Sequence, residues 1–444
     1  MFWNKKKKKE KANEQSSNNT TMFNFDPNLI QQNQTGLFDF QNQDYNFMNN
    51  IQGSMQDAPS EVKDEPVVKE RKNNGIDYNL VMLILFITVF GLVVLYSASS
   101  YYSLSEYKNT GYLFERQLGF IGVGIIIMFI TSLFSYKIFY RFGYIIYIVS
   151  IAFVVATLII GSAFRGSTRW IDIFGITFQP SELTKISVIV AMATYFTKHY
   201  SKLEDHKTIM KGLMIGLFPA FFIVSNNLST GIIVVLLAFF ISFIVSKRYL
   251  PFVILIAAAA VIYTFAEPIT KTIASAGLIR QYQLERILAW KNPSEYVDKT
   301  YQTLQSLYAV GSGGYMGKGL GSSIQKYVMP EAQNDMIFAI LAEEMGLFGT
   351  ISLLVVFLFM FYRIFKISMN ATEFFGSIVA FGVMAHIALQ VFLNIAVCLN
   401  LIPNTGITLP FISYGGSSSI VLFLEMGLVL SISRGSQEKT VWKN

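Results

Sequence analysis

Ten long apolar runs, separated by short polar gaps, are the feature that most limits what this chain can fold into. A helix needs about 20 mostly apolar residues to cross a bilayer, and it satisfies its own main-chain hydrogen bonds there. None of the runs shows the alternation over about ten residues that is typical of a membrane barrel strand. We therefore predict an all-α, polytopic membrane protein with about ten transmembrane helices. The expected helices are Asn79–Ser97, Gln117–Ser135, Tyr144–Gly161, Leu183–Thr197, Leu213–Val224, Gly231–Val245, Leu250–Ala266, Met336–Tyr362, Phe374–Leu399 and Ser418–Ser433.

The composition agrees with a membrane protein and argues against several other classes. Charged residues make up 14% of the 444 residues, against roughly 25% in a typical soluble domain. The single cysteine, Cys398, excludes an intrachain disulfide framework and a cysteine-based metal cluster, and three histidines argue against a His-rich metal site. The net charge of +7 is not a nucleic-acid signature, because most basic residues of the apolar part lie in the gaps between runs. We expect no nucleic-acid partner.

The chain divides into a polar tail at residues 1–77, a membrane domain at 78–434 and a short cytoplasmic C-terminal tail at 435–444. The N-terminal tail is rich in Asn and Gln and sustains no helical or strand period, so we predict that it is disordered. It begins with the lysine run Lys5–Lys9, and no apolar core follows closely enough for a signal peptide. The lysines are either simply solvated or attracted to anionic membrane lipid, at about 1 kcal/mol per basic residue.

The distribution of Lys and Arg in the short loops predicts the orientation in the membrane. With the N-terminus in the cytoplasm, the short cytoplasmic loops hold ten basic residues and the short outer loops hold four. This asymmetry predicts that both termini are cytoplasmic and that the number of spans is even. The segment 267–335, between the seventh and eighth spans, then forms a large extracellular loop. It is too long for a simple turn, so we expect it to be functional.

A first polar cluster, Gln179–Lys185, opens the fourth predicted span. Pro180 marks a helix start, and Ser181 is a candidate helix cap. Glu182 and Lys185 are three residues apart, which places them on one helix face near the outer boundary of the membrane. They form either a local ion pair or a polar floor for the charged headgroup of a ligand.

A second cluster lies in the predicted outer loop, where Tyr301–Ser306 leads to the glycine-rich stretch Gly311–Gly321, which contains Lys318. It is not a nucleotide-binding loop, because that motif needs Ser or Thr after the lysine at the start of a helix, and Gly319 stands there instead. We expect flexible backbone packed near a ligand.

The large loop ends at Asp335, directly before the eighth span. At the mouth of a helix this carboxylate is partly shielded from water, which raises the pKa of a carboxyl group toward the range useful to a general base, while nearby cations oppose the rise. The alternative role is a helix N-cap. Glu343 and Glu344, about two turns deeper, either pair with a polar partner or support the fold.

A third cluster, Leu401–Ser419, contains two prolines and three glycines within a mostly apolar stretch. Irregular backbone at membrane depth is tolerated only where protein or a water-filled cavity surrounds it. The alternative is an ordinary outer loop. Glu425 follows in the tenth span, and we interpret His386 in the ninth span as an interior histidine rather than a ligand.

Together these clusters resemble the SEDS family, the shape, elongation, division and sporulation proteins, which includes the peptidoglycan polymerases RodA and FtsW. The matching motifs occur in the family's order across residues 78–434, and the N-terminal tail lies outside them. They are Gly166–Asp172, Gln179–Lys185, Asn227–Gly231, Gly311–Gly321, Pro330–Gly349 and Pro403–Ser418.

The resemblance implies ten transmembrane helices and a glycosyltransferase that polymerises lipid II on the outer face of the bacterial cytoplasmic membrane. The family's essential aspartate closes a motif that opens with Pro-Glu, and this position is Asp335 here. Asp335 would take the proton of an acceptor sugar hydroxyl as its oxygen attacks the donor's anomeric carbon and undecaprenyl pyrophosphate leaves. We expect the remaining substrate contacts from Arg169, Trp170, Gln179, Ser181, Glu182, Lys185, Lys318, Glu331, Ser413 and Tyr414.

Cations should stabilise the leaving pyrophosphate, and the candidates are Lys185, Arg169 and a divalent cation such as Mg or Mn. No organic cofactor is expected. The implied partners are lipid II and undecaprenyl-linked glycan, a class B penicillin-binding protein with transpeptidase activity, and other division proteins.

Two departures from the commonest family pattern refine the expectation. Gln333 and Asn334 stand where His-Thr is usual, which weakens any role for that histidine and leaves Asp335 in place. Thr408 favours the FtsW branch, and hence cell division at the septum. The alternatives are a RodA-like polymerase for elongation, a lipid II flippase and a non-catalytic division scaffold. A flippase should show paired broken helices and internal repeats, whereas the sequence shows one broken region, near Pro403–Gly416, and no convincing repeat.

Overall fold

The computed structural model describes residues 75–160, 162–164, 167–173, 176–224, 227–275, 281–291 and 295–435. The chain separates into Met1–Glu70 and Arg71–Asn444, and all described residues lie in the second unit. The predicted disordered tail, up to residue 74, and the C-terminal tail from residue 436 therefore lie outside the described residues.

Each of the ten predicted apolar runs corresponds to a helix, and no run extends more than two residues beyond its helix. These helices are α3 (Tyr78–Tyr107), α4 (Tyr112–Leu133), α5 (Lys137–Ile160), α6 (Pro180–Lys198), α7 (His206–Val224), α8 (Leu228–Val245), α9 (Leu250–Thr264), α13 (Ile337–Met369), α14 (Phe374–Cys398) and α15 (Gly416–Gly435). Among the described residues, eight helices are long and apolar enough to cross a membrane. The other two of the ten are α6, which carries charged residues, and α9, which has 15 residues. A helical multi-pass membrane protein is thus confirmed, while ten spans remain a prediction.

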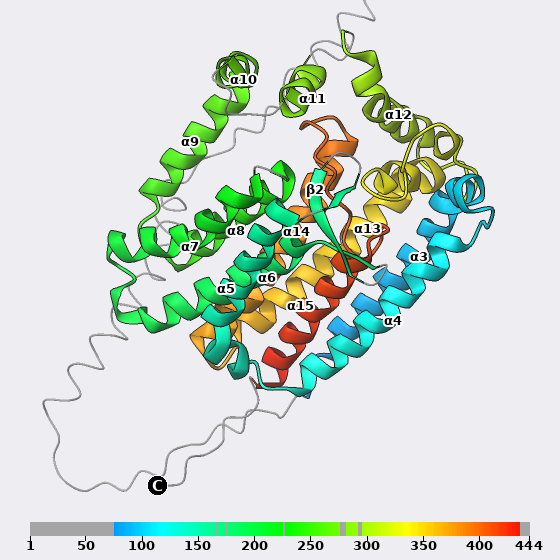
Figure 1. The fold of residues 1–444 in the computed structure, drawn as a ribbon. Coiled ribbons are helices and arrows are strands. Elements are labelled where there is room, and N and C mark those ends of the chain that lie inside the picture. Colours follow the sequence, from blue (N-terminus) through cyan, green and yellow to red (C-terminus); the bar gives the residue numbers. More distant parts are fainter. Residues whose placement is uncertain are drawn as a thin grey trace, which may run out of the picture. The chain divides into compact units, whose positions relative to one another are not determined.

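The helices α6 and α14 form the interior of the bundle. α6 packs against α5, α7, α8 and α14, and α14 also packs against α8, α13 and α15. Gly382 allows α14 to approach α6, because a Cβ there would lie 2.6 Å from Ile189 Cγ2. On one side of this interior, α3 and α4 lie side by side, and α4 packs along α15 (Figure 1).

Three short antiparallel strands join α5 to α6, where the sequence predicts no strand. They are β1 (Ser162–Phe164), β2 (Ser167–Ile173) and β3 (Ile176–Phe178), in the order β1-β2-β3, and Ile171 pairs with Phe178. This segment consists of short runs of β-branched and aromatic residues between glycines, a composition that favours strands and turns. The all-α prediction therefore holds for the bundle and is wrong for this connection.

The long segment between α9 and α13 is mostly helical. It contains α10 (Ala266–Ser275), α11 (Gln281–Lys291), α12 (Val297–Gly313) and the 3₁₀ turn η2 (Gln325–Tyr327). α12 packs against α13 and α14. The last helix of this polar segment, α12, therefore lies against the bundle.

Two irregular backbone segments follow Asp335 in the chain: a break inside α13 and the connection between α14 and α15. Gly346, with φ 65° and ψ −167°, breaks α13 nine residues after the helix begins. The segment 399–415, which connects α14 to α15, has no helix or strand, and Leu409, Phe411 and Ile412 within it are buried. A Cβ on Gly91 of α3 would lie 2.5 Å from the Phe411 carbonyl oxygen. The irregular backbone is thus enclosed by protein, as its apolar sequence requires.

Candidate active site

Asp335 lies where three separate parts of the chain meet. Its Oδ1 accepts a hydrogen bond from Gln302 Nε2 of α12 at 3.2 Å, and its main-chain oxygen accepts one from Asn394 Nδ2 of α14 at 2.7 Å. Asn394 Nδ2 also donates to the Ile407 oxygen at 2.8 Å, which fixes the 399–415 segment at the same point. The residue at the N-cap of α13 is Met336. The alternative role of Asp335 as the N-cap is therefore wrong.

The segment 399–415 brings the third predicted cluster to Asp335. The Tyr414 main-chain nitrogen donates to the Gln333 oxygen at 3.0 Å, and a Cβ on Gly406 would lie 3.9 Å from Asp335 Oδ2. Ser413 is buried, and its Oγ accepts a hydrogen bond from the Leu409 nitrogen at 2.8 Å. This contact gives Ser413 a role in shaping the turn. Burial raises the pKa of the Tyr414 phenol above its ordinary value, so its hydroxyl stays protonated and can donate a hydrogen bond.

Three non-glycine residues in the segments that lead to Asp335 and connect α14 to α15 have backbone conformations that are rare for their type. Glu331, Asn400 and Phe411 have φ values of 54°, 54° and 64°. Such conformations cost on the order of 1–3 kcal/mol each and cluster at functional sites. Glu331, a predicted substrate contact, is half-buried, and its Oε2 accepts a hydrogen bond from Asn334 Nδ2 at 3.0 Å.

The Glu182–Lys185 pair forms as the spacing predicts. The Lys185 ammonium lies 2.9 Å from Glu182 Oε2, and the side chains are 0% and 10% exposed. Both residues lie at the start of α6, which packs against the helix that carries Asn394. The expected cap is wrong, because α6 begins at Pro180 with Gln179 at the N-cap, and Ser181 Oγ accepts from Gln179 Nε2 at 3.0 Å.

The glycine-rich stretch that follows α12 is docked on the break in α13. The Lys318 ammonium lies 2.6 Å from Glu343 Oε1, and the Lys318 and Gly319 nitrogens donate to the Glu343 and Glu344 carbonyl oxygens, both at 2.9 Å. Ser97 of α3 donates to Glu344 Oε1 at 2.6 Å. Glu343 and Glu344 thus have polar partners, and Lys318 anchors this stretch.

Two of the predicted substrate contacts, Arg169 and Trp170, lie in β2, and their side chains lie outside those that the structure describes. Ser162 pairs with Trp170 in the strand ladder. Their proposed roles therefore rest on the sequence alone.

The described donor set does not fit a metal site made by protein side chains alone. Within the described ranges, no group of three His, Cys, Asp or Glu side chains is arranged to hold a metal ion. Mg²⁺ often binds through one or two carboxylates together with substrate phosphates. A divalent cation at this site therefore stays a prediction.

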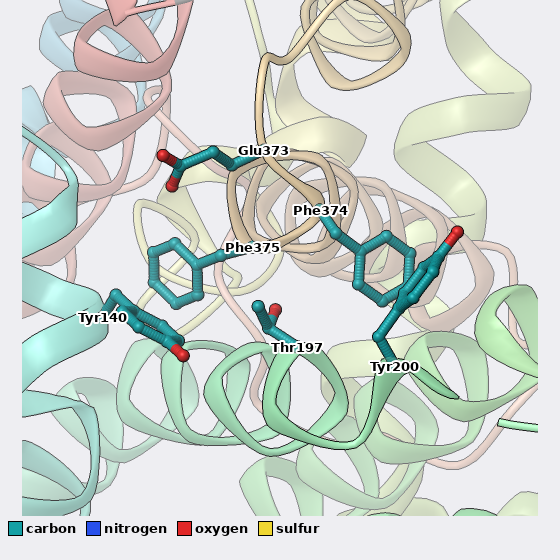
Figure 2. Close-up of a pocket in the computed structure, with 6 residues that line it drawn as sticks. All are labelled: Tyr140, Thr197, Tyr200, Glu373, Phe374 and Phe375. Carbon is teal, nitrogen blue, oxygen red and sulfur yellow. The ribbon is translucent and has the colours of Figure 1, made fainter. Parts of the chain in front are cut away.

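A separate hollow of about 410 Å³ lies at the opposite end of α14 (Figure 2). Its position at the start of α14 is 20 residues, or roughly 30 Å of helix, from Asn394. Glu373 on its rim lies 2.7 Å from the Lys137 ammonium. It is not part of the site around Asp335. The hollow is lined by Tyr140, Thr197, Tyr200, Glu373, Phe374 and Phe375.

The sequence did not assign a role to three amides near Asp335: Gln302 and Asn394, which donate to it, and Asn404, which donates to Gln302. Asn394 could have been found, since a polar residue within an apolar span is a functional candidate by default. Gln302 and Asn404 lie inside the second and third predicted clusters, but nothing in a single sequence indicates that they reach Asp335. His386 is interior as predicted, and its Nδ1 lies 2.8 Å from Glu425 Oε2.

Comparison with known proteins finds one family along nearly the whole membrane part. The cell cycle protein family of FtsW, RodA and SpoVE matches residues 78–438. Stage V sporulation protein E of Bacillus subtilis (strain 168) is 33% identical over 374 residues, which are 82% of this chain and 99% of that protein. The probable peptidoglycan glycosyltransferase FtsW of the same organism is 32% identical over 368 residues, covering 80% of this chain and 90% of that protein.

Two solved structures share the fold at 22% identity. A chain from a structure entitled "Structural coordination of polymerization and crosslinking by a peptidoglycan synthase complex" has a TM-score of 0.65, covering 81% of this chain and 98% of that one. The rod shape determining protein RodA of Thermus thermophilus has a TM-score of 0.56, covering 81% of this chain and 97% of that one.

Proposed function

The chain belongs to the SEDS family of FtsW, RodA and SpoVE, and from that membership we propose that it is a peptidoglycan glycosyltransferase that polymerises lipid II at the outer face of the cytoplasmic membrane. The observation that carries the proposal is the placement of Asp335. The carboxylate is half-buried and lies between α12, the start of α13 and the 399–415 segment.

The proposed reaction uses Asp335 as a general base. A sugar hydroxyl of the acceptor gives its proton to the carboxylate while its oxygen forms a bond to the anomeric carbon of the donor. The bond from that carbon to the pyrophosphate breaks, and undecaprenyl pyrophosphate leaves with the electron pair. Arg169 is the proposed cation beside the leaving group. Lys185 is fully buried and paired with Glu182, so it acts on the developing charge only through its electrostatic field.

The test is polymerisation of lipid II by the purified full-length chain carrying Asp335→Asn. This substitution keeps the shape and removes the base, so we expect kcat to fall about 10²- to 10⁴-fold with little change in KM. The matched control is Asp205→Asn, an exposed carboxylate between η1 (Tyr200–Lys202) and α7. Wild-type kcat in the Asp335→Asn variant would remove Asp335 from the mechanism.

We further propose a role in septal synthesis with a class B penicillin-binding protein as partner. Thr408 supports the FtsW branch, and the synthase-complex structure supports a partner by its fold alone. The position of a fluorescent fusion in dividing cells distinguishes the two branches. An FtsW-like role predicts signal at the septum, and a RodA-like role predicts signal along the side wall. Co-purification with the transpeptidase tests the partner.

A lipid II flippase is the second candidate, favoured by the break inside α13 at Gly346. Transporters use such discontinuous helices at their substrate sites. Movement of labelled lipid II across vesicles without glycan product would support this function. A non-catalytic scaffold predicts that Asp335→Ala still supports septation when the protein is made and localises.

A further inference from the structure

Asp335 is held by a chain of amide side chains that joins it to the 399–415 segment. The Gly406 main-chain nitrogen donates to Asn404 Oδ1 at 3.0 Å, and Asn404 Nδ2 donates to Gln302 Oε1 at 3.0 Å. Gln302 Nε2 then donates to Asp335 Oδ1 at 3.2 Å and to the Pro330 oxygen at 3.1 Å. Residues 302, 335 and 404 are far apart in the sequence, so only the fold brings them together.

The direction of these hydrogen bonds follows from the partners at the two ends. A main-chain N–H can only donate, so the end of Asn404 that faces Gly406 must be its oxygen. The other end of Asn404 is an amino group, which can only donate, so it requires the oxygen of Gln302. The amino group of Gln302 therefore faces Asp335. The Pro330 carbonyl, which can only accept, requires the same orientation.

We propose that Gln302 is a positioning residue for the base and that Asn404 sets the orientation of Gln302. The inference rests on the proposed function, in which Asp335 accepts a proton. A donor fixed on Oδ1 favours the ionised carboxylate and holds its plane in one orientation. Because Asn404 and Gly406 belong to the 399–415 segment, that segment acts together with the Pro330 carbonyl to turn the amino group of Gln302 toward Asp335.

Gln302→Glu tests this role with little change in shape. A glutamate at 302 keeps its acceptor for Asn404 and replaces the amino group that faces Asp335 with an oxygen. We expect kcat for lipid II polymerisation by the purified full-length chain to fall about 10- to 100-fold, as for a small misplacement of a reacting group. KM should change by less than about threefold, and the thermal midpoint should stay within about 2 °C of the wild type, because one surface-accessible amide is changed. Gln302→Leu, which removes donor and acceptor together without adding charge, should lower kcat similarly.

Asn404→Asp tests the orientation step at a residue whose side chain bonds Gln302 rather than the base. Aspartate at 404 has no donor, so it favours the orientation in which Gln302 turns its amino group toward residue 404 and its oxygen toward Asp335, against the opposite preference of the Pro330 carbonyl. We expect a fall in kcat of about tenfold in the otherwise wild-type chain and no further fall in the Gln302→Leu chain, because coupled residues are non-additive.

The outcomes distinguish a failure of the proposed positioning role of Gln302 and Asn404 from a failure of the proposed function. Wild-type kcat in both Gln302 variants would overturn the positioning role. An equal effect of Asn404→Asp in the otherwise wild-type chain and in the Gln302→Leu chain would also overturn it. A variant that changes only KM or only the thermal midpoint, with wild-type kcat, would also contradict it, because Gln302 would then have a structural role alone. An inactive wild type or a fully active Asp335→Asn variant would instead refute the proposed function.

Discussion

At the scale of single residues, the buried charged side chains in the described part of the chain occur in close pairs. Glu182 and Lys185 lie 2.9 Å apart with almost no exposed surface. Moving an ion from water into a low-dielectric interior costs several kcal/mol, which a well-placed partner offsets. The pair therefore tolerates joint removal better than the loss of one member.

We predict that Lys185→Met lowers the free energy of unfolding by about 3–5 kcal/mol, since it leaves Glu182 buried and unpaired. The double variant Glu182→Gln/Lys185→Met should recover most of this loss. Thermal unfolding of the purified protein without substrate gives the comparison. Lys247→Met is the control, because Lys247 and Glu204 form an exposed pair at 2.6 Å whose loss should not measurably change stability. A double variant as unstable as Lys185→Met would contradict the argument.

Single contacts also show which parts of the site could be predicted from one sequence. The Glu182–Lys185 contact was predictable because residues three apart on a helix share a face. The Gln302–Asp335 contact was not, because it depends on where α12 docks against α13, and no local period encodes that docking. The contact between Lys318 and Glu343, which are 25 residues apart in the sequence, was unpredictable for the same reason, and a substrate contact of Lys318 stays a prediction.

At the scale of elements, the break in α13 is the feature that shapes the site. The first part of the helix starts beside Asp335, and the glycine-rich stretch docks where the helix breaks. The Leu347 and Phe348 nitrogens donate to the Gly314 and Tyr315 oxygens at 2.9 and 3.0 Å, so that stretch satisfies groups that a continuous helix would pair internally. The apolar run predicted the helix, but not the break, because glycine also occurs within ordinary membrane helices.

We predict that Gly346→Ala destabilises the protein and loosens the glycine-rich stretch. Its φ of 65° and ψ of −167° are adopted almost only by glycine, which makes the backbone strain about 1–3 kcal/mol. A Cβ there would also collide with the Gly317 main-chain nitrogen. Faster trypsin cleavage after Lys318 and a lower thermal midpoint are the expected results.

Gly311→Ala is the matched control for this prediction. Gly311 lies in α12, and a Cβ there meets no atom within 4 Å. Alanine should be neutral or slightly stabilising at that position, since it is the better helix former. Equal protease sensitivity of the two variants would show that the break in α13 does not hold the glycine-rich stretch.

At the scale of the whole molecule, the spans are readable from the sequence and their arrangement is not. The helices could be predicted from the length of the apolar runs, because the lipid core requires a similar length of every spanning segment. The central positions of α6 and α14 depend instead on close approaches such as Gly382 against Ile189. The short strands were missed because β1 and β3 have three residues each, too few to show a period.

The orientation of the protein in the membrane can be tested by labelling single introduced cysteines, because the natural cysteine is buried. Cys398 is 0% exposed, so it should not react with a maleimide that cannot cross the membrane. Met316, beside the break in α13, is 81% exposed, and Tyr200, near the other end of the bundle, is 63% exposed. The Lys and Arg asymmetry places Met316 outside the cell and Tyr200 inside. We predict that Met316→Cys is labelled on intact cells and that Tyr200→Cys is labelled only after the membrane is opened. The reverse pattern would place Asp335 on the cytoplasmic side, where it could not polymerise lipid II at the outer face, and would reject the topology and the proposed reaction together.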